Sequence, residues 1–439
     1  MRLKTFPGGI HPHDEKHYSA SAPISNLPTP ERVIIHLSQH IGAVSSPTVK
    51  VGDTVLKGQV VAVPAGFVSL VQHASISGKV TKIGKFLHPT GAMSMGIEIS
   101  SDQQDQSVEL HDDPDFMSLD PDELIARVSA AGICGMGGAG FPTHVKLSPP
   151  QDKPIDTVIL NGVECEPFLT SDYRLMLERS EDILHGLRII MRTLSAKKGI
   201  IGIEANKPDA IKLMQKLTAK EKDLSVVGFK LQYPQGAEKQ LIYAATKRKV
   251  PAGGLPMAVG VDVQNVGTAA AIYEAVRYQK PLIERVISVT GPIVNTPMNL
   301  LAPIGALYSD LLKHCGGVSA PIGKAISGGP MMGFALPSLD AAMTKGSSGL
   351  VLFDEKSARS MQEHTCLRCA HCVDICPMNL MPSMIANAVK YNDLKMAVKG
   401  GLNDCIKCGS CAYVCPAHIR LVQWIDTGKI RYAEAQRNK

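Results

Sequence analysis

The sequence has few aromatic residues and no long apolar run. Aromatic residues make up 5% of the chain and Trp424 is the single tryptophan, so a flat ligand would have to stack mainly on Phe, Tyr or backbone. No run of roughly eighteen apolar residues occurs, which argues against a membrane-spanning helix. The opening MRLKTFPGGIHPHDEK lacks the apolar core of a signal peptide. We therefore expect a globular protein of a reducing compartment, which reaches a membrane only through a partner.

The charge is mild and its pattern is diffuse. The net charge is +6, and Lys and Arg form no block, so we expect no nucleic-acid partner. At 439 residues the chain is too long for one ordinary domain. We expect a multidomain α/β plus β protein, divided as follows: an extended arm (1–30), a β barrel (31–103), an α/β domain (118–280), a β-grasp module (281–350), a helical cysteine-rich domain (356–425) and a basic tail (426–439).

The predicted barrel has the pattern of a carrier domain without the carrier residue. The run VKVGDTVLKGQVVA followed by ISGKVTKI resembles the barrel-sandwich hybrid of biotinyl and lipoyl carriers. Those carriers display a modifiable lysine at a hairpin tip, whereas the equivalent stretch here is AGFVSLVQHAS and has no lysine. We expect a structural or docking barrel in which the carrier chemistry is absent.

Eight of the eleven cysteines lie between positions 366 and 415. CLRCAHCVDICP and CIKCGSCAYVCP each follow C-x2-C-x2-C-x3-C-P, in which three cysteines hold one cluster and the fourth holds the other. Zinc is the alternative, but it does not call for two matched C-x3-C-P tails. We predict two [4Fe–4S] clusters, with ligands Cys366, Cys369, Cys372 and Cys415 for cluster 1 and Cys405, Cys408, Cys411 and Cys376 for cluster 2. The isolated Cys134, Cys165 and Cys315 are predicted to be packed side chains.

A glycine-rich stretch, AGICGMGGAGFP (131–142), suggests a phosphate-binding loop. A helix is predicted to begin at Pro121, with Asp120 as its N-cap, and to lead into the loop; a second helix is predicted from Pro142. In a Rossmann unit the glycines follow a strand instead, so this loop does not fit that fold. A tight packing turn remains an alternative. Nearby, the strand TVIL ends in NGVECEP (161–167), and ligands of α/β sheets bind at such strand ends.

Four blocks resemble a known flavoprotein. GMGGAGFPTHVK, NGVECEP, YPQGAEKQL (233–241) and VQNVGT (263–268) are similar, in the same order, to the flavin- and NADH-binding blocks of the 51-kDa subunit of respiratory complex I. Over nearly its whole length the chain resembles the C-subunit family of Rnf electron-transport complexes. The resemblance implies a barrel-sandwich hybrid, a 51-kDa-like flavin domain, a β-grasp module similar to a soluble-ligand-binding domain, and a double [4Fe–4S] domain.

The resemblance also implies a set of cofactor contacts. FMN would be lined or contacted by Gly135, Gly137, Gly138, Gly140, Lys146, Asn161, Glu164, Gly236 and Asn265. NADH would be held by Phe141, Glu166 and Glu238. Met136, Val163 and Ala237 depart from the complex I pattern and imply a less charged pocket. No side chain is expected to act as an acid or base, because the flavin carries the hydride chemistry.

The function implied is exchange of electrons between NADH and ferredoxin through FMN and two [4Fe–4S] clusters. Partner subunits in the membrane, including an iron–sulfur subunit, would couple this exchange to Na⁺ or H⁺ movement, and the chain would sit peripherally on the cytoplasmic face. One alternative is a cobalamin-reductase-like flavin and iron–sulfur protein. Another, of a different class, is a non-enzymatic iron–sulfur wire with a degenerate flavin domain.

Overall fold

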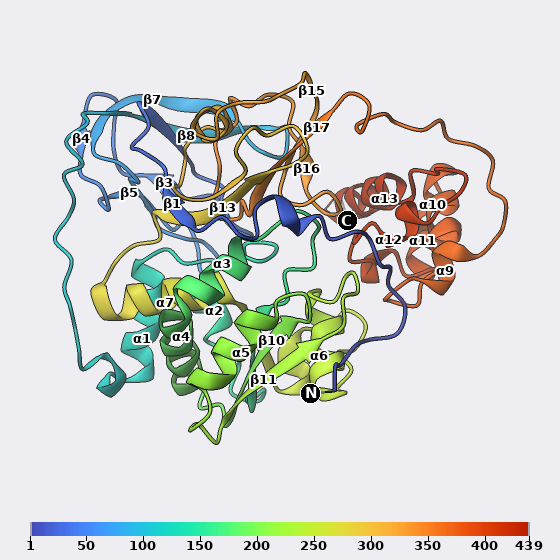
Figure 1. The fold of residues 1–439 in the computed structure, drawn as a ribbon, viewed down its shortest axis with the longest axis horizontal. Coiled ribbons are helices and arrows are strands. Elements are labelled where there is room, and N and C mark those ends of the chain that lie inside the picture. The colour runs from blue at the N-terminus through green and yellow to red at the C-terminus, as the bar shows by residue number, and fades with distance from the viewer. Residues whose placement is uncertain (1, 438–439) are drawn as a thin grey trace.

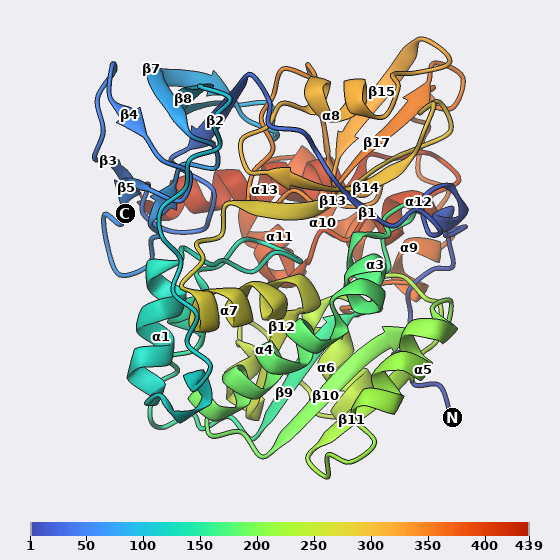
Figure 2. The same cartoon turned by 60° about the vertical axis from the view of Figure 1, so that its left-hand side comes forward.

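The computed structural model describes residues 2–437, which form four packed units (Figure 1). The barrel and the β-grasp module lie side by side, the α/β domain lies beneath them, and the helical cysteine-rich domain lies against one side (Figures 1 and 2). No helix within the described residues has the length and apolarity needed to cross a membrane.

The barrel is built from two small antiparallel sheets around an apolar core. Their strand orders are β2-β8-β7-β4 and β3-β5-β6. The core includes Val33, Ile35, Ile97 and Ile99, which are buried at alternating positions of β2 and β8. The strands are β2 (Arg32–His36), β3 (Ser46–Pro47), β4 (Thr54–Val55), β5 (Val60–Val63), β6 (Gln72–His73), β7 (Gly78–Leu87) and β8 (Met93–Ser101).

The α/β domain contains a fully parallel sheet of order β11-β10-β9-β12, which confirms the predicted architecture. One sheet face packs on α4 and α7 and the other on α6. Its elements are α1 (Pro121–Ala130), α2 (Thr143–Lys146), β9 (Thr157–Gly162), α3 (Ser171–Glu178), α4 (Ser180–Thr193), β10 (Lys198–Glu204), α5 (Pro208–Leu217), β11 (Leu224–Phe229), α6 (Glu238–Thr246), β12 (Val261–Asn265) and α7 (Val266–Tyr278).

Three segments of this domain differ from what their local sequence predicts. The amphipathic pattern from about Tyr173 to Leu194 predicts one helix, but the structure has two helices, broken at Arg179. The run FKLQYP predicts a strand, but the strand lies earlier, at β11. The helix predicted after the glycine loop is a single turn that ends at Lys146. Helix α1 does begin at Pro121, although the Asp120 side chain makes no capping hydrogen bond.

The β-grasp module is a six-stranded mixed sheet that recruits the N-terminal arm. Its order is β1-β14-β13-β17-β15-β16, and β1 from the arm pairs in parallel with β14. The sheet continues to Asp354, four residues past the predicted boundary at 350. The elements are β1 (Ile24–Asn26), β13 (Glu284–Thr290), β14 (Met298–Pro303), α8 (Tyr308–His314), β15 (Ile322–Ser327), β16 (Phe334–Ala335) and β17 (Gly349–Asp354).

The arm runs along the α/β domain and past the cysteine-rich domain before it reaches this sheet (Figure 1). Lys4 bridges to Phe229, Ile10 bridges to Tyr233, and the Gly9 amide donates to the Ile375 carbonyl at 2.8 Å. The predicted extended arm is therefore the strap that joins three units. Met1 of the arm lies outside the described residues.

The cysteine-rich domain is helical, as predicted. Its helices are α9 (His371–Asp374), α10 (Pro382–Lys390), α11 (Leu394–Lys399), α12 (Ser410–Tyr413) and α13 (Leu421–Arg437). Helix α13 crosses the boundary predicted between 425 and 426, so the basic segment continues the helix up to Arg437. The remaining two residues of the predicted tail, 438–439, lie outside the described part of the chain.

Candidate functional site

The glycine loop is closed at its base and open in its middle. Cys134 and Pro142 form a β-bridge, and the Gly135 amide donates to the Phe141 carbonyl at 2.9 Å. A Cβ added at Gly137 would lie 2.8 Å from Asn265 Nδ2, whereas one at Gly138 would meet nothing within 4 Å. The loop therefore brings bare backbone against the Asn265 side chain and leaves space beside Gly138.

Two predicted ligand amides lie in register on neighbouring strands. Asn161 of β9 pairs with Asn265 of β12 at the carboxyl edge of the parallel sheet. Asn161 Nδ2 donates to the Gly236 carbonyl at 2.8 Å, and Asn265 Oδ1 caps α7 by accepting from the Gly267 amide at 2.8 Å. The sheet thus brings the loops of YPQGAEKQL and VQNVGT to one edge, where ligands of such sheets bind.

Lys146 joins this edge from the other side of the glycine loop. Its Nζ donates to Glu238 Oε1 at 3.0 Å and to the Val263 carbonyl, and it lies 3.8 Å from Asp262 Oδ1. Burial alone would lower the Lys146 pKa, but the Asp262 and Glu238 carboxylates outweigh it and raise the pKa. The lysine therefore stays cationic beside the strand that ends in Asn265.

Glu164 is placed as a helix cap. Its backbone is left-handed, with φ 46°, a conformation that costs free energy and gathers at functional sites. Its carboxylate accepts from the Asp172 amide at 2.7 Å and the Tyr173 amide at 3.2 Å, so it satisfies the first turn of α3. The structure brings Glu164 close to the site, but its oxygens are already hydrogen bonded.

Asp172 is a site residue that no sequence pattern predicted. Its Oδ2 accepts from Asn265 Nδ2 at 2.6 Å, so it fixes the amide that faces Gly137. Burial, together with the nearby Glu164 carboxylate, raises the pKa of Asp172 to about 7. Its position eight residues beyond Glu164 carries no motif that could have indicated this role.

Glu166 lies between the α/β domain and the β-grasp module. Its carboxylate accepts from the amides of Met331 and Met332 at 3.0 and 2.9 Å, and the Tyr233 hydroxyl lies 3.4 Å from it. Burial raises its pKa to about 7. The Tyr233 hydroxyl also donates to the Cys408 carbonyl at 2.8 Å, so this group links the α/β domain to the cysteine array.

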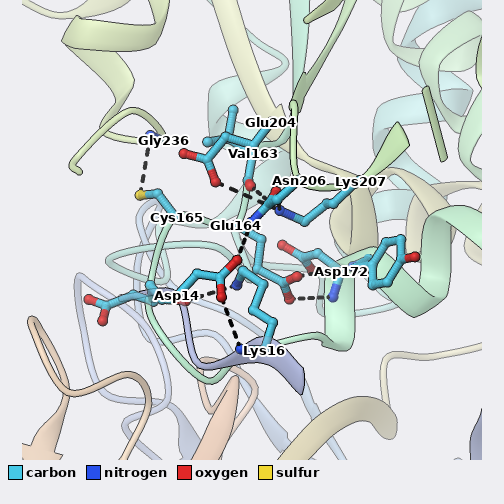
Figure 3. A network of polar contacts seen from close by, with 12 residues as sticks. Asp14, Lys16, Val163, Glu164, Cys165, Asp172, Glu204, Asn206, Lys207 and Gly236 are labelled. Carbon is cyan, nitrogen blue, oxygen red and sulfur yellow. Dashed lines mark hydrogen bonds and ion pairs between the residues drawn. The ribbon is translucent and has the colours of Figure 1, made fainter. Parts of the chain in front are cut away.

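Two buried lysines hold the NGVECEP segment (Figure 3). Lys207 Nζ donates to the Val163 carbonyl at 2.8 Å, and Lys16 Nζ donates to the carbonyls of Glu166 and Leu169 at 3.0 and 2.5 Å. These lysines are distant in sequence from the segment that they hold, so local motifs gave no signal for them. They stabilise a loop whose backbone is otherwise unfavourable at Glu164.

Cys165 is more than a packed side chain. Its Sγ accepts from the Gly236 amide at 3.3 Å, which ties NGVECEP to YPQGAEKQL. Burial, with a further contribution from the Glu204 carboxylate, raises the pKa of this thiol well above its usual range. Cys134 and Cys315 are buried, in accordance with the prediction for them.

The eight clustered cysteines line two cavities in the groups predicted from their spacing. Cys376, Cys405, Cys408 and Cys411 line one, and Cys366, Cys369, Cys372 and Cys415 line the other. In residues 2–437, no three metal-binding side chains converge on a single ion position. Thiols spread around a cavity fit a four-iron cluster, whose ligands stand apart on its corners. Backbone amides also donate to sulfur, from Lys407 to Cys405 and from Leu380 to Cys376, both at 3.4 Å.

The α/β edge likewise fits a flavin mononucleotide. Gly137 lies so close to Asn265 that a side chain there would fill the cradle. The side-chain amide of Gln235 is buried, and neither its Oε1 nor its Nε2 has a hydrogen-bond partner among the described residues. Such groups are uncommon in folded proteins and are often satisfied by a ligand or water. The glycines, Lys146, Asn161, Gly236 and Asn265 form one contiguous group, whereas the Glu166 carboxylate is bonded to the β-grasp module.

Family models match all four units. Residues 4–104 match the RnfC barrel sandwich hybrid domain, 128–274 the Nuo51 FMN-binding domain, 286–335 the SLBB domain, and 360–416 a 4Fe–4S dicluster domain. The chain also resembles a chain of an NAD⁺-reducing [NiFe]-hydrogenase, with a TM-score of 0.51 and 18% identity over 72% of this chain and 64% of that one. This second likeness concerns the fold alone.

Curated relatives share much more sequence. The C subunit of the proton-translocating ferredoxin:NAD⁺ oxidoreductase complex of Clostridium ljungdahlii is 48% identical, covering 88% of this chain and 84% of the relative. Its counterpart in the Na⁺-translocating complex of Acetobacterium woodii is 44% identical, covering 88% of each. The counterpart in the ion-translocating oxidoreductase complex of Pseudomonas aeruginosa is 40% identical over 100% of this chain and 57% of its own length. This chain therefore belongs to the C-subunit family of ion-translocating ferredoxin:NAD⁺ oxidoreductase complexes.

Proposed function

We propose that this chain is the subunit that exchanges electrons with NAD(H) at FMN and passes them through two [4Fe–4S] clusters. Partner subunits of a membrane complex complete the exchange with ferredoxin and couple it to translocation of Na⁺ or H⁺. The observation that carries the proposal is the continuity of the two sites. The loop that ends at Gly236 begins at Tyr233, and the Tyr233 hydroxyl is bonded to the Cys408 carbonyl.

The residues at the α/β edge hold and orient the flavin. FMN, when bound, accepts a hydride from NADH as an electron pair and releases single electrons. Gly135, Gly137, Gly138 and Gly140 let backbone approach it, Lys146 supplies a cation for its phosphate, and Asn161, Gly236 and Asn265 supply polar contacts. For NADH, Phe141 supplies an aromatic face, 37% exposed, and Glu238, bonded to Lys146, supplies a carboxylate at the same edge.

Glu164 and Glu166 have narrower roles than the family resemblance of the chain implies. Glu164 shapes the loop next to FMN by capping α3. The Glu166 carboxylate is held by the amides of Met331 and Met332, so its contribution to NADH binding is through the position of its loop. This assignment explains why the two carboxylates can share one short segment without both facing a negatively charged dinucleotide.

The two cysteine groups differ in their place along the route. Cys376, Cys405, Cys408 and Cys411 hold cluster 2, and this group lies next to the α/β domain. Cys366, Cys369, Cys372 and Cys415 hold cluster 1, and Cys366 and Cys369 are exposed. Cluster 2 is accordingly the one nearer the flavin, and cluster 1 the one that faces a partner subunit. We place the chain on the cytoplasmic face, where NAD(H) and ferredoxin are found.

Cofactor analysis of the reconstituted full-length chain tests the proposal. We expect stoichiometric FMN with iron and sulfide for both clusters, and bleaching of the flavin absorbance when NADH is added. Iron and sulfide without flavin would instead support an iron–sulfur wire with a degenerate flavin domain. Membership of a membrane complex is checked by co-purification of partner subunits from membranes.

A further inference from the structure

The barrel meets the glycine loop through its tip, which comprises residues 38–46 and 64–71. The Ile41 amide donates to the Gly140 carbonyl at 3.2 Å. The backbone of Phe67 lies beside the His144 imidazole. Gly140 and His144 lie on either side of Phe141, so the tip borders the residue expected to face the dinucleotide.

The tip is held in place by buried polar contacts. Lys345 Nζ donates to the Gly132 carbonyl at 2.7 Å and to the Val71 carbonyl at 3.3 Å. The Lys345 amide donates to Gln39 Oε1 at 2.9 Å. Lys345 is 1% exposed, and it connects the β-grasp module, the barrel and the start of the glycine loop. A carrier hairpin must move to deliver its group, whereas this one is fixed against the α/β domain.

The outer surface of the tip is apolar. Phe67 is 74% exposed, Ile41 49% and Val44 50%, while neighbouring Phe141 is 37% exposed. These side chains are not part of the apolar core of the barrel. An exposed apolar patch next to a polar cradle is typical of a ligand-binding wall. In a chain with 5% aromatic residues, an exposed phenylalanine on the barrel tip and another on the adjoining glycine loop need an explanation.

We propose that the barrel tip is a wall of the dinucleotide site and that Phe67 gives the adenine ring of NAD(H) a face to stack on. The inference rests on the proposed function and deepens it, because it assigns a binding role to the barrel. The hairpin that carries a modified lysine in biotinyl and lipoyl proteins here supplies an aromatic ring. No bond is made or broken by the tip; it contributes binding and orientation only.

Binding of ADP-ribose to the FMN- and cluster-loaded chain tests this assignment. ADP-ribose contains the adenine and the pyrophosphate but no nicotinamide, so it occupies the site without reducing the flavin. Phe67→Ala should raise the dissociation constant roughly tenfold, since stacking of a base on an aromatic side chain contributes a comparable factor elsewhere. Phe67→Tyr should restore binding. FMN and iron content should match the wild type in both variants.

Val51→Ala is the matched control, since Val51 is 58% exposed on the barrel but lies in a turn away from the tip. It should leave the dissociation constant unchanged. If the wild type and Phe67→Ala bind ADP-ribose equally well, the binding role of the barrel tip is wrong, while the proposed function remains intact. A flavin-loaded wild type that does not bind ADP-ribose would overturn both.

Discussion

The two cysteine groups are alike in sequence and different in setting. Cys376, Cys408 and Cys411 of cluster 2 are 9%, 7% and 8% exposed, while Cys366 and Cys369 of cluster 1 stand in a segment, residues 359–371, whose side chains are all exposed. Two identical motifs have therefore been given an inner and an outer position. The difference indicates the direction of the relay, because a buried cluster exchanges electrons within the chain and an exposed one exchanges them with a partner.

Contacts with the α/β domain account for the inner position. Gln240 Nε2 donates to the Pro377 carbonyl at 3.0 Å, next to Cys376. The Gly253 amide donates to Asp404 Oδ1 at 3.1 Å, next to Cys405. Together with the Tyr233 contact to Cys408, these bonds hold two ligand loops of cluster 2, at Cys376 and at residues 405–408, against the α/β domain.

The largest expected effect comes from removing one ligand of each group. Cys408→Ala and Cys369→Ala should each lose about half of the bound iron, because each removes one of two clusters. After NADH is added, Cys369→Ala should still show the EPR signal of a reduced cluster. Cys408→Ala should show little or none, because it lacks cluster 2, which would pass electrons from the flavin to cluster 1.

Dithionite provides the control for this pair of variants. It is a small reductant that supplies electrons without the flavin, so it should produce the signal of the remaining cluster in both variants. Equal reduction of both variants by NADH would contradict the inner and outer assignment. An EPR spectrum unchanged by either substitution would contradict the ligand assignment itself.

A second large effect should be the loss of FMN from a chain that keeps both clusters. Gly137→Asp places a side chain where a Cβ already lies 2.8 Å from Asn265 Nδ2 and adds negative charge beside a phosphate site. We expect loss of FMN with near-normal iron content, measured by cofactor extraction. Gly138→Ala is the matched control, because a Cβ there meets nothing within 4 Å, and it should retain the protein fold. Loss of iron together with FMN in Gly137→Asp would show that the loop is structural.

The parts of this design that depend on local spacing could be predicted from sequence, and the parts that depend on domain packing could not. The grouping of Cys366, Cys369 and Cys372 with Cys415 follows from the spacing of the motifs, and the parallel sheet follows from alternating strands and helices. The inner position of Cys408 depends on its contact with Tyr233, 175 residues away. No periodicity records such a contact.

The same reason applies to the partners of the two carboxylates in NGVECEP. The NGVECEP motif indicates that Glu164 and Glu166 are close to the site, but each is satisfied by backbone amides from another segment. Asp172 and the lysines at 16 and 207 lack a motif of their own, since their roles depend on the path of the folded chain. The break at Arg179 was hidden because the apolar pattern of α3 and α4 continues across it.

A smaller effect concerns the pH dependence of folding stability, through Asp172 of the α/β domain. Burial and Glu164 raise the pKa of Asp172 from 3.8 to about 7, so its neutral form is favoured in the folded state. Its stabilising contribution is present below the unfolded pKa and is lost as the pH rises through about 7. Asp172→Asn removes this titrating group. Between about pH 5 and 8 the melting temperature of the wild type should therefore fall by a few degrees more than that of the variant.

Differential scanning fluorimetry across this pH range measures the effect. Glu363→Gln is the control, because Glu363 is an exposed carboxylate in the outer segment 359–371, and its profile should follow that of the wild type. Parallel profiles for Asp172→Asn and the wild type would show that Asp172 does not titrate in this range. The coupling to Glu164 then would hold the carboxyl in one protonation state throughout.

The smallest expected effect isolates one of the bonds between the inner cluster loop and the α/β domain. Tyr233→Phe keeps the ring and removes the hydroxyl that donates to the Cys408 carbonyl at 2.8 Å. One such bond contributes about 1 kcal/mol, so local opening of residues 405–411 should become about fivefold more frequent. Hydrogen exchange of these amides measures it, and Tyr391→Phe, at a residue 79% exposed on the outer surface, is the control. If both variants exchange like the wild type, the inner position depends on the bonds of Gln240 and Gly253 instead, and the Tyr233 hydroxyl adds nothing to the docking.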